Sequence, residues 1–177
     1  MATTKWAIDP THSEIGFKVK HMMFTNVSGK FDAFEATAET EDENFEGANI
    51  SFAAQADSVN TGNSDRDNHL KSGDFFDAAQ YPKLEFTSTA FNKTDEGNYE
   101  LHGNLSLHGE TKPVSLHVEY GGIGKDPWGN TKAGFTLSGK FNRKDFGLTW
   151  NAALEAGGVL VSDEVRIHAD VQLVKQA

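Results

Sequence analysis

Apolar and polar residues alternate in six stretches of this chain. A period of two is typical of a β-strand that has one face toward water and the other toward an apolar interior. The apolar positions of the six stretches are Ile15-Phe17-Val19, Ile50-Phe52-Ala54-Ala56, Leu101-Gly103-Leu105-Leu107, Val114-Leu116-Val118-Tyr120, Phe135-Leu137-Gly139-Phe141 and Val165-Ile167-Ala169-Val171-Leu173. The whole pattern predicts eight or nine strands without an internal repeat. So many strands in 177 residues are expected to form one closed or nearly closed sheet, an all-β fold with a single domain over residues 1–177.

Residues 57–82 interrupt the strand pattern. Their first part is polar and rich in turn-forming residues, and their second part holds Phe75 and Phe76 in a polar setting. Asp65 or Asp67 is expected to cap a short helical segment near residues 66–80. Long excursions from a compact domain tend to be lids or binding elements. Because two adjacent Phe rings are costly to leave in water, we expect them to plug or line one end of the barrel.

The composition favours a dry interior. Thirteen Phe residues stand against three Tyr, and Phe supplies a large apolar area without a polar group. Ordinary core packing is the alternative for any one of them. Small residues at inward positions are compatible with an unfilled centre, and these are Ala54, Ala56, Gly103, Gly139 and Ala169.

Charge and termini exclude several classes of partner. A net charge of −10 without a basic cluster argues against nucleic acid and against anionic membrane surfaces. The absence of Cys excludes disulfides and thiolate chemistry. No apolar run approaches the roughly 18 residues of a membrane span, so no stable membrane insertion is expected. The N-terminus lacks a secretory signal, which predicts a cytoplasmic location for the chain as it stands, or a periplasmic one if a leader precedes it.

The polar residues suggest few catalytic arrangements. No pair among the seven His has a spacing that gathers three metal ligands. His12 and Ser13 are neighbours in sequence, but adjacent strand residues point apart. Arg66, Asp67 and His69 lie beside the Phe pair. Two interpretations stay open for them: they hold the polar head group of a ligand, or an Arg66–carboxylate pair fixes the loop to the barrel. For Arg143 and Asp145 the fixing role is favoured.

Several short motifs occur along the chain in a fixed order. They include Trp6-x-Ile8-Asp9-x-x-His12-Ser13-x-Ile15-x-Phe17, Gly29-x-Phe31, Arg66-Asp67-x-His69-Leu70, Asp74-Phe75-Phe76-Asp77, Tyr81-Pro82-x-Leu84-x-Phe86-x-Ser88, Gly109-x-Thr111-Lys112-Pro113-Val114 and Arg143-x-Asp145-Phe146-Gly147-Leu148. Together they resemble the YceI family of polyisoprenoid-binding, lipocalin-like bacterial proteins, from about Trp6 to Leu173. The resemblance implies an extended eight-stranded antiparallel lipocalin-like barrel. In that family the channel of the barrel holds a polyisoprenoid chain, such as the tail of an isoprenoid quinone, or another long lipid, and the resemblance implies the same for this chain. The family also includes homodimers.

The leading hypothesis is therefore a protein that binds an isoprenoid lipid for carriage, storage or sequestration, without a catalytic residue, cofactor or metal. The predicted channel lining is Ile15, Phe17, Val19, Phe31, Phe52, Phe75, Phe76, Phe86, Leu105, Leu116, Phe135, Phe146 and Ile167. The predicted polar mouth is His21, Arg66 and His69. One alternative is an enzyme acting on a lipid-like substrate, with His21, Arg66 and Asp67 as acid–base groups. Others are a binding protein for a different amphiphile, such as a fatty amide, and a stress-response scaffold with an incidental pocket.

Overall fold

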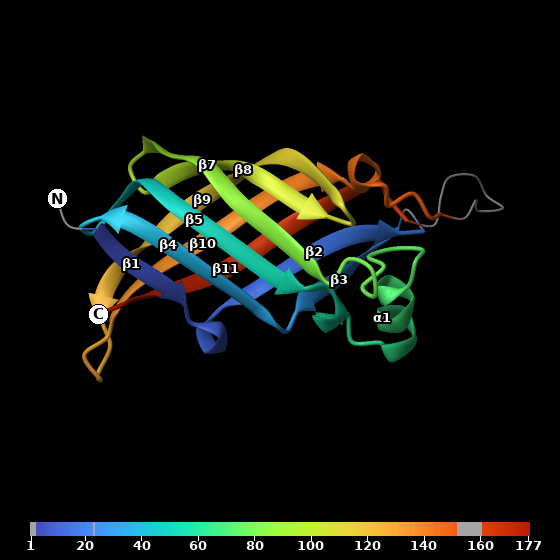
Figure 1. The fold of residues 1–177 in the computed structure, drawn as a ribbon, viewed down its shortest axis with the longest axis horizontal. Helices are drawn as coiled ribbons and strands as arrows, with labels where there is room; N and C mark the ends of the chain where they lie inside the picture. The colour runs from blue at the N-terminus through green and yellow to red at the C-terminus, as the bar shows by residue number, and fades with distance from the viewer. Residues whose placement is uncertain (1–2, 23, 152–160) are drawn as a thin grey trace.

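The strands form a closed antiparallel barrel. The computed structural model describes residues 3–22, 24–151 and 161–177 (Figure 1). Among these residues, eight strands follow one another around the barrel, and the pairing of the last with the first closes it. In spatial order they are β1 (Thr3–Ile8), β4 (Phe34–Glu41), β5 (Asn44–Gln55), β7 (Lys83–Asp95), β8 (Asn98–Leu107), β9 (Glu110–Lys125), β10 (Thr131–Asn142) and β11 (Glu164–Lys175). This confirms the all-β, eight-stranded antiparallel barrel.

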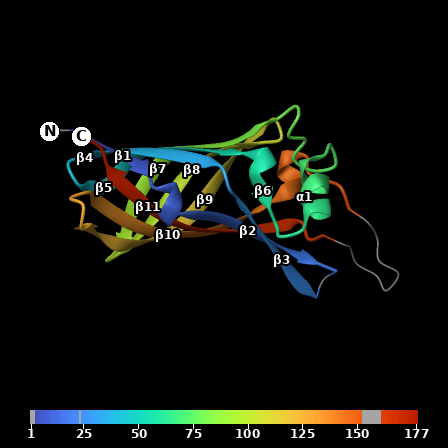
Figure 2. The same ribbon diagram turned by 90° about the horizontal axis from the view of Figure 1, so that it is seen from below.

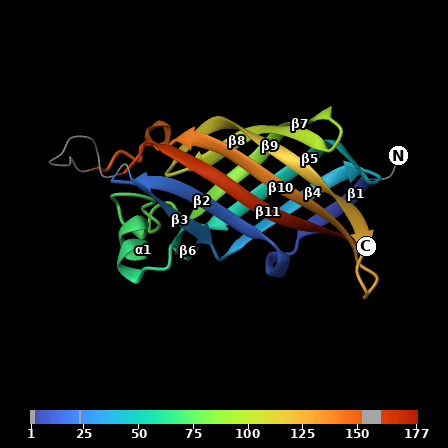
Figure 3. The ribbon, with the colours of Figure 1, turned by 180° about the vertical axis from the view of Figure 1, so that it is seen from behind.

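Three further strands extend the wall at the end of the barrel where the helix lies (Figures 1 and 2). They are β2 (Glu14–His21), β3 (Thr25–Phe31) and β6 (Val59–Asn60). β1 and β2 are two parts of one path along β11: Ile8 pairs with Leu173 and, after a turn at Pro10–His12, Ile15 pairs with Ala169. Since β3 pairs with β2 and β6 pairs with β3, the wall continues beyond the end of β1. Both chain termini lie at the opposite end (Figure 3).

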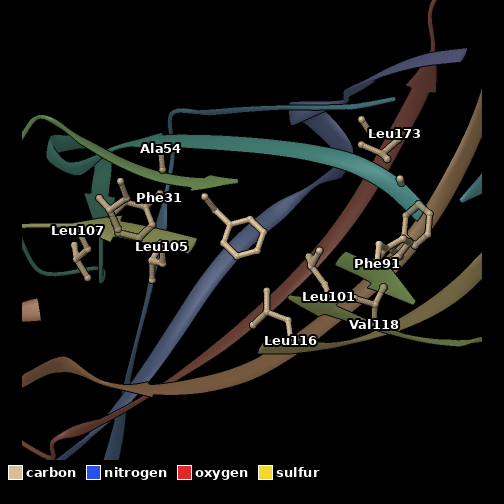
Figure 4. Close-up of a cluster of buried hydrophobic side chains, with 14 of the residues drawn as sticks. Phe31, Ala54, Phe91, Leu101, Leu105, Leu107, Leu116, Val118 and Leu173 are labelled. Atoms are coloured by element: carbon tan, nitrogen blue, oxygen red, sulfur yellow. The ribbon is translucent and has the colours of Figure 1, made fainter. Parts of the chain in front are cut away.

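The apolar positions of the alternating stretches face the interior. In β8, Leu101, Leu105 and Leu107 are buried, whereas Glu100 and Asn104 on the other face are exposed. Figure 4 shows side chains from several strands pointing inward in this way. The period of two therefore determines which alternate residues of each strand face the interior.

An aromatic cluster closes the end of the barrel that holds the termini. Trp6 is 1 % exposed, and its indole Nε1 donates a hydrogen bond of 3.0 Å to Thr40 Oγ1. The ring of Phe45 lies 4.9 Å from the rings of both Trp6 and Phe135, measured between centroids. The cluster also contains Phe91, Tyr99 and Tyr120. Six aromatic residues thus bury a large apolar area at this end.

Two inward glycines provide room for large neighbours and do not create empty space. A Cβ at Gly103 would lie 2.3 Å from Cζ of Phe86 and 2.5 Å from the backbone oxygen of Thr87. A Cβ at Gly139 would lie 2.3 Å from Cδ2 of Leu116. Each glycine therefore lets a neighbouring side chain lie against the wall instead of across the interior.

The helical segment is shorter than expected and is capped differently. α1 spans Ser64–Lys71, and residues 72–82 form turns without a helix. Neither Asp65 nor Asp67 caps it; Asn63 does, because its side chain accepts a hydrogen bond of 3.0 Å from the backbone N–H of Arg66. The described part of the chain contains no helix with the length and apolarity needed to cross a membrane.

Candidate functional site

A cavity of about 380 Å³ lies inside the barrel. Its wall extends from Phe45 and Phe91, near the termini, to His69 and Trp150 at the end where α1 lies. Protein ligand pockets usually measure about 300–1,000 Å³, so the interior keeps a space of ligand size between its Phe rings. A water molecule takes up roughly 30 Å³, and a CH₂ group is about the same size. The cavity therefore holds on the order of a dozen carbon atoms of a lipid tail.

Twelve of the thirteen apolar residues predicted for the lining border this cavity. They are Ile15, Phe17, Val19, Phe31, Phe52, Phe75, Phe76, Phe86, Leu105, Leu116, Phe135 and Ile167. Most of them occupy alternate positions on barrel strands, which places them on one face of the sheet. Contact between these side chains and a bound lipid stays a prediction.

Phe146 is the one member of the predicted lining that does not border the cavity. It is 1 % exposed and ends the short 3-10 helix η3 (Arg143–Phe146). Its ring packs edge-on against Phe141, with centroids 5.2 Å apart, and it borders a groove on the outer face of the barrel. The strand alternation stops at Asn142, where η3 turns the chain away from the wall. The structure therefore places Phe146 outside the cavity wall, because it lies on η3 and not on a strand.

Polar side chains gather at the α1 end of the cavity. The three residues predicted for the mouth, His21, Arg66 and His69, all border it. The wall at this end also includes three polar residues that the sequence analysis did not assign to it, namely Lys20, Thr61 and Arg143. Among the described residues, no Asp or Glu borders the cavity. The long interior is therefore apolar, and the cationic residues of its wall lie at one end.

Thr61 fixes the position of Arg66. The guanidinium Nε donates a hydrogen bond of 2.7 Å to Thr61 Oγ1, and Nη2 donates one of 2.8 Å to the backbone oxygen of Thr61. Asp67 Oδ1 in turn accepts bonds of 2.9 Å from the backbone N–H and 2.6 Å from the hydroxyl of Thr61. Arg66 forms no ion pair with a carboxylate of the described residues, so this part of the chain gives no support to the alternative of an Arg66–carboxylate pair. Its outer nitrogen, Nη1, has no hydrogen-bond partner among the described residues.

An aromatic group surrounds His69 at the same end. The imidazole ring packs edge-on against Phe75 and Trp150, with centroid distances of 5.0 Å and 4.7 Å. Its Nε2 lies 2.9 Å from Asp74 Oδ2, which holds the ring in place. Phe76 packs against Phe31 with centroids 5.7 Å apart. The segment after α1 thus contributes both of its Phe rings to the cavity wall.

Arg143 joins separate parts of the chain. Its side chain is nearly buried, and it donates hydrogen bonds of 2.6 Å to the backbone oxygen of Leu148 and 2.9 Å to that of Ser162. A longer bond of 3.4 Å reaches the backbone oxygen of Val161. Burial lowers the pKa of the guanidinium, and the Asp163 carboxylate at 4.0 Å opposes that shift. The expected fixing role fits this geometry, with Asp163 in place of Asp145.

Only two of the three residues considered for acid–base catalysis border the cavity. Of the three residues considered for catalysis, His21 and Arg66 border the cavity, but Asp67 does not. Asp67 instead accepts two hydrogen bonds from Thr61. The described residues also contain no group of three or more His, Asp or Glu that is placed to hold a metal ion.

Comparison with known families identifies the chain. The model of the YceI-like domain matches residues 6–173, which is nearly the whole barrel. The chain belongs to the YceI family. The motifs spread from Trp6 to Leu173 account for this match, and the resemblance read from them is confirmed.

Related YceI-like chains occur in staphylococci. A UPF0312 protein of Staphylococcus aureus (strain MSSA476) is 33 % identical over 170 residues, covering 96 % of both chains. A UPF0312 protein of Staphylococcus epidermidis (strain RP62A) is 34 % identical over 170 residues, again covering 96 % of both chains. The similarity therefore extends over the complete length of these relatives apart from a few residues.

Solved structures share the YceI barrel. The Campylobacter jejuni YCEI protein is 33 % identical, with a TM-score of 0.78 and 96 % of both chains covered. BcnA of Burkholderia cenocepacia has a TM-score of 0.81 at 21 % identity, covering 93 % of this chain and 98 % of its own. A polyisoprenoid binding domain from Saccharophagus degradans has a TM-score of 0.63 at 14 % identity, covering 97 % and 98 %. The last two similarities establish the fold alone.

Proposed function

We propose that this protein binds one long isoprenoid lipid, with the tail inside the barrel and the head group at the α1 end. The observation that carries this proposal is the distribution of polarity along a single cavity. The deep part of the wall is apolar between the Phe45 cluster and Phe86, whereas Lys20, Arg66 and Arg143 all lie at the mouth. An amphiphile with one long tail matches that distribution better than a compact polar substrate does.

The cavity volume supports useful affinity for such a tail. A dozen carbon atoms correspond to two or three prenyl units, and each buried CH₂ contributes roughly 0.8 kcal/mol. The transfer of this part of the tail from water therefore contributes about 10 kcal/mol before the cost of immobilising it. An apolar wall discriminates poorly between similar tails, so the mouth is expected to supply the selectivity.

The mouth favours a head group that accepts hydrogen bonds. Nη1 of Arg66 has no hydrogen-bond partner among the described residues, and neither Arg66 nor Lys20 is paired there with a carboxylate. A phosphate, or the carbonyl oxygens of a quinone, would pair with such donors. The YceI family and the fold shared with a polyisoprenoid binding domain of Saccharophagus degradans support an isoprenoid tail. We infer that the protein carries or stores this lipid.

The first test is the identity of the bound molecule. Purified protein is extracted with organic solvent, and the extract is analysed by mass spectrometry. We expect a prenyl lipid in stoichiometric amount, or stoichiometric uptake of geranylgeranyl phosphate by protein that has been stripped of lipid. A protein that neither contains nor takes up a prenyl chain would refute the proposal.

The second test separates the head group from the tail. Arg66→Gln is expected to weaken binding of geranylgeranyl phosphate about tenfold, as expected for a lost charge-assisted hydrogen bond, and to change binding of geranylgeraniol little. Lys71→Gln is the matched control, because Lys71 is on α1 but does not border the cavity. Equal losses for both variants, or for both ligands, would place the head group elsewhere.

A further inference from the structure

The hairpin between β2 and β3 exposes an apolar tip. Met22 is 40 % exposed and Phe24 is 79 % exposed, although both are large hydrophobic residues. The backbone N–H of Phe24 donates a hydrogen bond of 3.2 Å to the oxygen of His21, which holds the turn together. Met22 has a φ of +54°, a conformation that favours Gly or Asn in a hairpin turn. The turn therefore presents an apolar side chain where ordinary turn chemistry predicts a small or polar one.

This hairpin is also the basic part of an acidic protein. The chain has 26 Asp and Glu residues, yet none lies between Gly16 and Phe31, where Lys18, Lys20 and Lys30 occur. Lys18 and Lys20 form no ion pair with a described residue, and Lys30 lies 4.0 Å from Asp32.

The positive charge continues across the neighbouring strands. On the outer face, Lys18 pairs with Arg166 of β11, and Arg166 pairs with Lys140 of β10. Like charges directly opposite each other are unfavourable in a sheet. Glu164 lies 3.3 Å from Arg166 and 3.4 Å from Lys140, so one carboxylate offsets two cations. Asp163 pairs with Lys144, and Asp145 borders the same outer groove as the three cations, together with Lys112. A band of net positive charge remains beside the hairpin.

The hairpin lies at the mouth of the cavity. Val19, Lys20 and His21, the last residues of β2, border the cavity, and His21 forms a β-bridge with Val161. Figure 2 shows that the tip projects from the barrel at the end where α1 lies. A lipid that leaves a bilayer beside this tip therefore has a short path into the barrel.

We propose that the β2–β3 hairpin docks this protein on an anionic phospholipid membrane. Met22 and Phe24 enter the headgroup region, and the lysines of the hairpin contact lipid phosphates, which is a general mode of interfacial binding. The acidic remainder of the surface is repelled by the same membrane, so the mouth faces the bilayer. The net charge of −10 is not evenly distributed, because this end is basic although the protein as a whole is acidic.

A membrane suits this tip better than a second copy of the chain. A stable protein interface buries about 800 Å² on each partner. The two exposed apolar side chains among the described residues of this turn supply much less area than that, whereas an interfacial anchor needs only a few apolar groups near cations. The proposal goes beyond the proposed function, because it concerns the source of the lipid and does not depend on which lipid is bound.

Vesicle flotation tests the proposal with the full chain. We expect flotation with vesicles that mix phosphatidylglycerol and phosphatidylcholine, and loss of flotation with pure phosphatidylcholine or at high salt. Phe24→Ser is expected to weaken partitioning at least about tenfold, the effect of withdrawing part of one Phe ring from an apolar phase. Lys18→Gln with Lys30→Gln is expected to weaken binding to the anionic vesicles in particular.

Trp128→Ser is the matched control for the apolar tip. Trp128 is 82 % exposed and lies in the turn between β9 and β10, at the opposite end of the barrel from α1 (Figure 1). Its replacement is expected to leave flotation unchanged. The proposal is overturned if the wild type does not float, or if Trp128→Ser lowers flotation and Phe24→Ser does not. It is also overturned if Phe24→Ser converts a dimer into a monomer in sedimentation, because the tip is then an interface between two copies.

A separate measurement keeps this proposal apart from the proposed function. In detergent solution, Phe24→Ser is expected to bind geranylgeranyl phosphate as the wild type does, because Phe24 does not border the cavity. Failure of the wild type to bind the prenyl chain in detergent would contradict the proposed function alone. Normal binding in detergent without vesicle flotation would contradict membrane docking alone.

Discussion

Filling the cavity from its wall is the most direct perturbation of the proposed site. Ala54 on β5 is 1 % exposed and borders the cavity, and Figure 4 shows it pointing inward. Its neighbour Ala53 points to the opposite face of the same strand and does not border the cavity. Ala54→Phe and Ala53→Phe therefore add the same ring on the two sides of one wall.

The expected loss of lipid affinity in Ala54→Phe follows from the cavity volume that the added Phe ring fills. Six added carbons occupy the place of about six carbons of the lipid tail, which is about half of the estimated capacity of the cavity. At roughly 0.8 kcal/mol for each buried CH₂, the upper limit of the loss is about 5 kcal/mol. Part of this is recovered when the tail shifts, and the ring itself costs about 1–3 kcal/mol of folding stability where it overpacks. We expect at least a hundredfold weaker binding.

Titration with prenols of increasing length measures this effect. For the wild type, affinity is expected to rise from geraniol to farnesol and to be nearly the same for geranylgeraniol, because the cavity holds two or three prenyl units. For Ala54→Phe, it is expected to level off at least one prenyl unit earlier, while Ala53→Phe follows the wild type. Urea unfolding of each variant checks that it is folded. If folded Ala54→Phe retains the length dependence of the wild type, the tail does not lie in this cavity.

Two further predictions concern stability. Arg143→Met removes three hydrogen bonds to backbone oxygens and is expected to lower the free energy of unfolding in urea by about 3–5 kcal/mol. Lys144→Met, at an exposed position, is the control for Arg143→Met and should change the free energy of unfolding by less than about 0.5 kcal/mol. A similar small loss for both variants would show that the buried contacts of Arg143 do not stabilise the fold. Asp9 accepts hydrogen bonds from Thr11 and contacts His12 and Lys132, which hold its pKa far below the usual value of 3.8. A depressed carboxyl pKa stabilises the fold above pH 3.8 and loses this effect as the pH falls below it, so the stability deficit of Asp9→Asn should be largest near pH 6 and should narrow below pH 3.8. A deficit that is independent of pH would contradict this assignment.

The strand pattern was readable from the sequence because burial on one side of a sheet requires strict alternation. That rule places Phe17, Phe52, Leu105 and Ile167 on the inner face, and all four border the cavity. It does not extend to Phe146, because a 3-10 helix follows the strand after Asn142 and the period of two no longer applies there. Alternation is a local property, and it predicts only as far as the strand extends.

Contacts between distant segments were not readable in the same way. The buried Arg143 donates hydrogen bonds to backbone oxygens of residues 5 and 19 positions away in sequence. Thr61 forms hydrogen bonds with both Arg66 and Asp67. The aromatic group around His69 brings Trp150 from a segment about 80 residues later in the chain. No rule of sequence spacing relates these residues, since they become neighbours only when the strands close into a barrel.

The sequence by itself determined the family, the all-β barrel and which side of most strands meets the interior, because these depend on motifs and on a local period of two. The tertiary structure decided that the inward Phe rings leave a cavity, that its positive charges gather at one mouth, and that the apolar hairpin tip stands beside that mouth. These features depend on how eight strands are tilted and closed around one axis. A pattern along a single strand carries no information about that closure.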